Sequence, residues 1–182
     1  MTSPARLVFD ATALSHFARA DRLGELQVLI GPDEPVLVAE VASELASGIP
    51  DHPALARVTT ASWLVRVRLK ETAEIARFAR YQAELGGQPG RNQGEASVLA
   101  WVSSHGGTAI VDDRAGCELG RREGIDVRRT LWLLLIKGYK AGTLDRVTLE
   151  ATTDDLIATG MRLPVKSGAD LFAWAAKNGL YP

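Results

Sequence analysis

Residues 94–116 read GEASVLAWVSSHGGTAIVDDRAG, and this stretch decides the fold that the sequence predicts. Its first part has the pattern of a helix opened by Glu95, and a Gly-Gly pair then marks a tight turn. The apolar run 108–111 is typical of a short buried strand that delivers Asp112 and Asp113 to its carboxyl end. Ligands bind outside the carboxyl ends of strands in open α/β sheets. Acids at this point therefore indicate a functional site.

The size and composition of the chain indicate one soluble domain. With 182 residues, of which 46% are hydrophobic and 24% charged, the chain matches an average globular protein. We expect a single domain over 1–182, with a core at about 6–145 and a C-terminal helical extension at about 146–182. We find neither a membrane span nor a signal peptide. We therefore expect a cytoplasmic protein without a membrane partner, and the single cysteine, Cys117, agrees with a reducing compartment.

Charge is distributed unevenly along a chain whose net charge is only −1. Residues 1–50 carry three basic and seven acidic side chains, a balance of −4, whereas residues 57–91 carry seven basic and three acidic, a balance of +4. An acidic centre beside a basic flank suits a metal-dependent enzyme that attracts a polyanionic substrate. Ordinary solvated helix faces are the alternative explanation for the basic residues.

Short apolar runs alternate with segments of helical spacing along most of the chain. Runs at 6–9, 36–38 and 108–111 predict buried strands, and the alternating segment 63–69 predicts a peripheral strand. This order predicts an α/β fold with three layers, in which helices cover both faces of a mostly parallel central sheet. Extra C-terminal helices are expected at about 152–159 and 169–178.

Two of the predicted helices carry more specific expectations. In the segment 71–85, we expect a buried stripe of apolar side chains formed by Ile75, Phe78, Ala79 and Leu85. We also expect Thr130 to cap a strongly apolar helix over 131–140.

Acids lie at separate element ends, and their types and positions favour a metal site. Asp10 follows the first strand, although capping of the next helix explains an Asp there equally well. Glu44 lies on the helix after the second strand, where a solvated surface position is the alternative. Clustered carboxylates repel by about 4 kcal/mol per pair at roughly 4 Å and an effective dielectric near 20. Such a cluster makes sense around Mg²⁺ or Mn²⁺, which take oxygen ligands.

The sequence resembles the PIN-domain family, and within it the VapC-type toxins and their close relatives. The resemblance covers about residues 7–145 and rests on the order and spacing of several short motifs. These motifs are LVFDATALSHFA, VLVAEVASELASG, GEASVLAW, AIVDDRAG and RRTLWLLLIKGYKAG. The family pattern has four acids, which match Asp10, Glu44, Glu95 and the Asp112-Asp113 pair. Asp113 is the preferred match within the pair, and Thr12 matches a small hydroxyl residue near the metal.

The resemblance implies an endoribonuclease that depends on Mg²⁺ or Mn²⁺ and acts on an RNA substrate. It also implies the toxin of a toxin-antitoxin pair, silenced by a protein antitoxin and forming a homodimer. Asp10, Glu44, Glu95 and Asp113 would be the catalytic metal ligands, with Asp112 assisting the metal or capping the next helix. Arg114 and Lys137 are candidates for phosphate contact. Glu95 departs from the family pattern, since many of these toxins have Asp at this position.

Two other functions compete with the nuclease interpretation. A phosphatase of the haloacid-dehalogenase type also starts with a strand that ends in Asp, but it needs a second Asp two residues later, where this chain has Thr12. A non-catalytic binding or regulatory module with the same fold is the second alternative. If all the acids were helix caps, no metal site would exist.

Overall fold

A computed structural model describes residues 4–86 and 92–180 of the chain. Its centre is a five-stranded sheet, and all four strand pairings are parallel. The strands are β1 (Arg6–Phe9), β2 (Glu34–Val38), β3 (Val65–Val67), β4 (Thr108–Ile110) and β5 (Asp126–Arg128).

The strand order β3-β2-β1-β4-β5 places β1 at the centre of the sheet, between β2 and β4. In the register of the central pair, Phe9 lies opposite Ile110. The next residue continues this ladder, because the backbone amide of Asp10 donates to the carbonyl of Ile110 over 3.0 Å. The carboxyl ends of β1 and β4 therefore meet at one edge.

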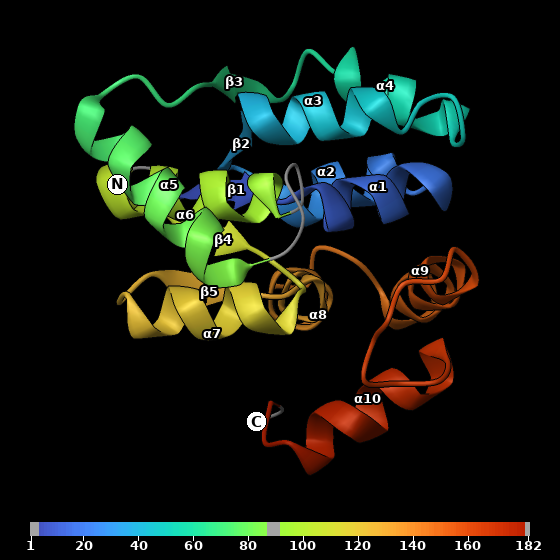
Figure 1. The fold of residues 1–182 in the computed structure, drawn as a ribbon. Helices are drawn as coiled ribbons and strands as arrows, with labels where there is room; N and C mark the ends of the chain where they lie inside the picture. Colours follow the sequence, from blue (N-terminus) through green and yellow to red (C-terminus); the bar gives the residue numbers. More distant parts are fainter. Residues whose placement is uncertain (1–3, 87–91, 181–182) are drawn as a thin grey trace.

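Helices cover both faces of the sheet, which confirms the predicted three-layer α/β fold (Figure 1). On one side lie three helices, of which α6 packs against β1, β2 and β4. These are α5 (Thr72–Leu85), α6 (Gln93–His105) and α7 (Arg114–Arg122). On the other side lie α1 (Ala11–Arg19) and α2 (Leu23–Ile30), while α3 (Ala39–Ser47) contacts both α1 and α6. The short helices η1 (Pro53–Leu55) and α4 (Ala56–Thr59) follow α3.

The C-terminal helices are packed onto the second side of the fold. The apolar segment after β5 forms α8 (Thr130–Trp132) and then a π-helix, η2 (Leu133–Lys140), where a single α-helix was expected. Helix α9 (Arg146–Ala158) packs against η2 and α1, and α10 (Gly168–Lys177) packs against α9. No helix in the described part of the chain is long and apolar enough to cross a membrane.

The prediction of an apolar stripe on α5 is confirmed for Phe78 and Leu85 and wrong for Ile75 and Ala79. Ile75 is 51% exposed and Ala79 is exposed, whereas the fully buried side chains of this helix are Glu74 and Tyr81. Phe78 and Leu85 remain partly buried. The helix is therefore rotated so that an acid, not an isoleucine, faces the protein.

Glu74 can be buried because its carboxylate is fully engaged. It accepts hydrogen bonds from the backbone amides of Lys70, over 2.7 Å, and Glu71, over 2.9 Å. Its other oxygen lies 3.2 Å from Nε2 of His105 on α6. Burial alone would raise the pKa of Glu74, but these amides and His105 hold it below its usual value.

We predict that Glu74→Ala lowers the free energy of unfolding by about 0.5–2 kcal/mol, because the capping hydrogen bonds to the amides of Lys70 and Glu71 are lost. Ile75→Ala, one residue along the same helix, should change it by less than about 0.5 kcal/mol, as expected of a surface substitution. Urea denaturation of both variants measures the difference. A larger loss for Ile75→Ala would contradict this orientation of α5.

Candidate metal centre

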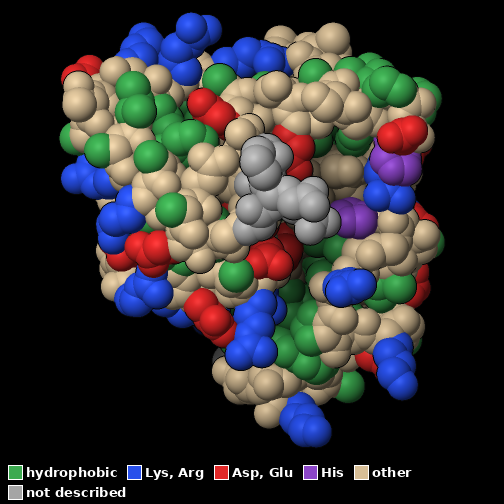
Figure 2. Space-filling view, in the orientation of Figure 1, with side chains coloured by type: hydrophobic (Ala, Val, Ile, Leu, Met, Phe, Trp, Pro, Cys, Tyr) green, Lys and Arg blue, Asp and Glu red, His purple; other side chains and the backbone are tan. Residues whose placement is uncertain are grey.

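The acids predicted from the sequence lie around the carboxyl-terminal ends of the neighbouring strands β1 and β4. Asp10 directly follows β1, and Asp112 and Asp113 follow β4. Glu44 comes from α3, and Glu95 from the first turn of α6. In Figure 2, Asp and Glu side chains gather at the centre of the face that shows this edge.

Asp10 is the most deeply buried of these acids, with only 3% of its surface exposed. It is the N-cap residue of α1 and accepts a hydrogen bond from the amide of Thr12 over 3.4 Å. Burial raises its pKa, the amides of Ala11 and Thr12 and the hydroxyl of Thr12 oppose the rise, and Asp112 adds to it. Asp10 therefore caps the helix, as the structural alternative expected, while its carboxylate also lies among other acids.

Two glycines allow the acids to approach the helices around them. A Cβ atom added at Gly94 would lie 2.7 Å from Oε2 of Glu44 and 3.0 Å from Oδ1 of Asp10. A Cβ added at Gly116 would lie 3.1 Å from Oε2 of Glu95. Asp10 and Glu44 thus meet at the start of α6, and Glu95 rests against the first turn of α7.

The four acids interact electrostatically. Burial, followed by the charges of Asp10, Asp113 and Glu44, raises the pKa of Glu95 to about 8. Glu44 is exposed as a whole residue, but partial desolvation of its carboxyl group and then the charge of Asp10 likewise raise its pKa. The structure therefore brings together Asp10, Glu44, Glu95 and Asp113, the four acids that were matched to the family pattern.

The two neighbouring acids after β4 differ in their contacts. Asp112 accepts hydrogen bonds from the amide of Thr130, over 2.9 Å, and from its hydroxyl, over 2.6 Å. Asp113 caps α7 by accepting from the amides of Ala115 and Gly116. The expectation that Thr130 caps its own helix is wrong, because its side chain instead joins the start of α8 to the end of β4.

The cations proposed from the sequence for phosphate contact are already engaged elsewhere. Arg114 is exposed and pairs with Glu118 over 2.7 Å. Lys137 pairs with Asp33 over 2.5 Å. Asp33 directly precedes β2, so this pair lies at the amino-terminal ends of the strands, opposite the acids. The structure does not bring Lys137 to the acids.

Sequence reasoning missed Arg129, which directly follows β5 at the same edge as the acids. Its Nε donates to Sγ of Cys117 over 3.4 Å. This hydrogen bond and the nearby charges of Asp112 and Asp113 raise its pKa. Its position just after a strand was the signal that could have revealed it.

Two cavities show where there is room around these residues. One of about 360 Å³ lies between α1 and α3 and is lined by Thr12, His16 and Glu44. The other, of about 290 Å³, is lined by Asp112 and Arg129 together with residues from the C-terminal part of the chain. The acids therefore lie between two hollows.

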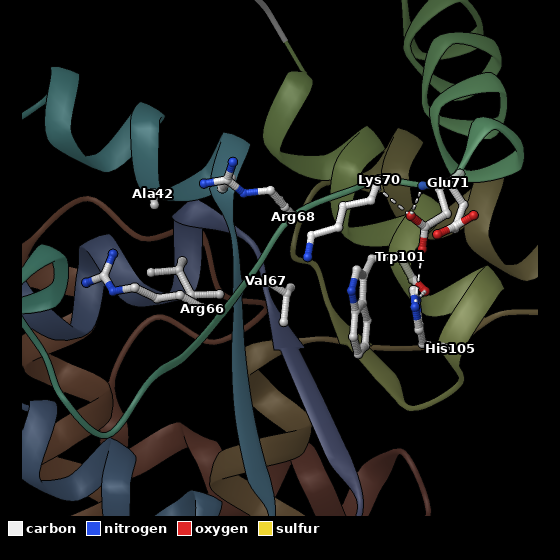
Figure 3. Close-up of a pocket in the computed structure, with 11 residues that line it drawn as sticks. Ala42, Arg66, Val67, Arg68, Lys70, Glu71, Trp101 and His105 are labelled. Carbon is white, nitrogen blue, oxygen red and sulfur yellow. Dashed lines mark hydrogen bonds and ion pairs between the residues drawn. The ribbon is translucent and has the colours of Figure 1, made fainter.

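A further pocket, of about 540 Å³, lies along the edge strand β3 (Figure 3). Its lining includes Arg66, Arg68, Lys70, Trp101 and His105, but none of the predicted site acids. Figure 3 shows Arg66 and Arg68 extending away from Trp101 and His105. Part of the basic flank seen in the sequence therefore lies at this edge of the sheet.

The chemical type of these side chains suits a divalent cation. They offer only carboxylate oxygens, the ligands that hard cations prefer, and none of the four forms an ion pair with a basic side chain in the described residues. Within residues 4–86 and 92–180, however, no group of three or more His, Cys, Asp or Glu side chains already stands in position to hold a metal ion. The carboxylates therefore shift one another's pKa values, but they are not yet arranged as the ligands of one metal ion.

A family model described as a PIN domain matches residues 6–173. The chain therefore belongs to the PIN-domain family. PIN domains are generally nucleases, and they typically use divalent metal ions. The matched region extends through α9 and into α10. No curated protein matches the chain.

We predict that Gly94→Ala weakens the binding of Mn²⁺ at least about tenfold, because the added methyl group displaces the carboxylates of Glu44 and Asp10. Tenfold weaker binding lowers the stabilisation by excess Mn²⁺ by about 1.4 kcal/mol, measurable as a smaller rise in melting temperature.

Gly24→Ala is the matched control, since Gly24 is also the second residue of a helix and a Cβ there meets nothing within 4 Å. It should respond to Mn²⁺ like the natural sequence. Equal responses from the two variants would show that the carboxylates near Gly94 take no part in binding the ion.

Proposed function

We propose that this PIN domain is an endoribonuclease that depends on Mg²⁺ or Mn²⁺, with Asp10, Glu44, Glu95 and Asp113 as ligands, directly or through water. The observation that carries the proposal is the pKa of Glu95, which burial and then the charges of the three other acids raise to about 8. Such mutual repulsion disfavours four ionised carboxylates, and a bound cation relieves it.

When bound, the ion would lower the pKa of a water molecule and stabilise negative charge on the scissile phosphate. Residues of the chain would hold the ligands of the ion in place. Asp10 is fixed by its hydrogen bonds to the first turn of α1, and Asp113 by those to the first turn of α7. A Glu95 carboxyl with a pKa of about 8 is largely protonated at neutral pH, so binding of the ion would be coupled to release of a proton.

The resemblance of the sequence motifs to VapC-type toxins supports a more specific role. We propose that the protein is the toxin of a toxin-antitoxin pair, cytoplasmic, homodimeric and inhibited by a protein antitoxin. Arg129, which follows β5 and lies beside Asp112, supports a polyanionic substrate.

The two rival functions have less support. The hydroxyl of Thr12 interacts with Asp10 where the phosphatase requires an acid, and the family match is to a PIN domain. A non-catalytic module would not require four acids to share one edge of the sheet, but it would keep the fold. Such a module would bind RNA or a partner but would not cut RNA in the presence of any metal ion. The absence of cleavage would separate it from the nuclease.

We expect the purified chain to cleave a mixed pool of single-stranded RNA in Mg²⁺ or Mn²⁺ and to stop when the metal is chelated. Asp10→Asn should slow cleavage by more than about 100-fold, since loss of even an indirect partner of a metal ligand commonly costs about 10- to 100-fold. Gel analysis of end-labelled RNA measures the rates.

Asp51→Asn is the matched control, because Asp51 is exposed and lies in a turn outside the sheet edge. It should cleave at the natural rate. The proposal would be contradicted by cleavage that persists in chelator, or by an Asp10→Asn variant that cleaves as fast as the natural chain. Hydrolysis of a phosphomonoester that is lost in Asp10→Asn would support the phosphatase instead.

A further inference from the structure

The cavity of about 290 Å³ beside Asp112 is built by elements from across the chain. Arg121 comes from α7, Arg129 follows β5, and Trp132 ends α8. Arg162 lies between α9 and α10, and Trp174 lies on α10. The C-terminal helices therefore complete a hollow that begins at the acids.

Its position continues the edge of the sheet on which the acids lie. Asp112 lines the cavity and also follows β4, and Arg129 follows the neighbouring strand β5. In Figure 2, hydrophobic side chains form a hollow below the central acids, with Lys and Arg side chains around it. A strand of nucleic acid passing over the acids would reach this hollow next.

The charge of the cavity favours an anion. Neither Arg121 nor Arg162 forms an ion pair with an acid within the described part of the chain, and both side chains are exposed. Arg129 has the thiol of Cys117 as its hydrogen-bond partner. Four guanidinium groups border the cavity, and of these Arg128 pairs with Asp126 over 2.8 Å. Planar guanidinium groups suit phosphate oxygens.

The same cavity offers flat aromatic surfaces. Trp132 and Trp174 line it, and both are only partly buried. The guanidinium of Arg128 lies 5.8 Å from the centre of the Trp132 ring, within the range of a cation–π contact. Indole faces stack on nucleobases of every kind. Indoles beside guanidinium groups thus match the two parts of a nucleotide, whereas an acidic peptide would use only the cations.

The volume of the cavity limits the size of its occupant. A value of about 290 Å³ lies near the lower end of ligand pockets, which begin at about 300 Å³. It suits one nucleotide and excludes a duplex. A base can enter such a site only from an unpaired strand, where it is free to leave its neighbours.

We propose that this cavity binds one unpaired nucleotide of the RNA strand, with its base against Trp174 and a phosphate at Arg162 and Arg129. The assignment of the strand as substrate rests on the proposed nuclease function. The cavity then fixes where a single strand lies relative to the acids, and the C-terminal helices act as part of the substrate site.

The test measures binding of a fluorescently labelled single-stranded RNA octamer by anisotropy, in the full chain carrying Asp10→Asn and without added metal, so that no RNA is cut. In this background, Arg162→Ala and Trp174→Ala should each weaken binding by about tenfold, within the range that loss of a stacked aromatic ring produces. Arg68→Ala, which removes one positive charge from the pocket at β3, is the charge-matched control and should have a much smaller effect.

The dependence on salt separates the two roles. Arg162→Ala should reduce the slope of log affinity against log salt by about 0.7, the value for one phosphate contact on a single strand, whereas Trp174→Ala should leave the slope unchanged. Trp174→Phe keeps an aromatic ring and should retain most of the affinity. This variant guards against a loss that comes only from misfolding, as does circular dichroism of each variant.

Equal weakening by Arg68→Ala and Arg162→Ala would overturn the proposal, because binding would then follow from bulk charge alone. Competition by a polyglutamate peptide as effective as that by unlabelled RNA would also overturn it, in favour of an acidic protein partner. If the natural chain cuts no RNA but Arg162→Ala and Trp174→Ala still weaken binding as expected, the nuclease proposal fails and the nucleotide site stands.

Discussion

The parallel pairing of β1 with β4 is the constraint on which the candidate site depends. In this pairing the backbone amide of Asp10 donates a hydrogen bond to the carbonyl of Ile110. Acids from distant parts of the chain therefore lie together at the carboxyl-terminal ends of these two strands. Burial, and then the repulsion that results from this placement, raise the pKa of Glu95 to about 8. Because this pKa lies above the unfolded value of 4.5, the contribution of Glu95 to stability falls as the pH rises from about 4.5 to about 8.

Much of the fold and of the candidate site could be predicted because short-range signals are strong where strands end. An apolar run followed by an acid located both Asp10 and the Asp112-Asp113 pair. The sequence could not separate Asp112 from Asp113 by their contacts. That distinction depends on Thr130, which lies beyond the following helix and strand.

Other features escaped prediction because they depend on how helices are rotated and on distant partners. Periodicity favoured Ile75 as a buried residue of α5, but the amides before that helix and His105 on α6 make Glu74 the buried one. Lys137 was expected near phosphate and instead pairs with Asp33. The cavity that contains Arg162 and Trp174 forms only when the C-terminal helices pack against the elements around β5, which no local pattern reveals.

The central claim is that the four acids act as one cation site. A carbon-13 NMR titration of the Glu95 carboxyl group, assigned by comparison with Glu95→Gln, tests this claim most directly. Without metal, Glu95 should titrate near pH 8, because of its burial and its acidic neighbours. Saturating Mg²⁺ should lower this pKa by at least about one unit, because the ion and the proton compete for the same carboxylate. An ordinary pKa near 4.5 without metal, or a raised pKa that Mg²⁺ leaves unchanged, would contradict the account.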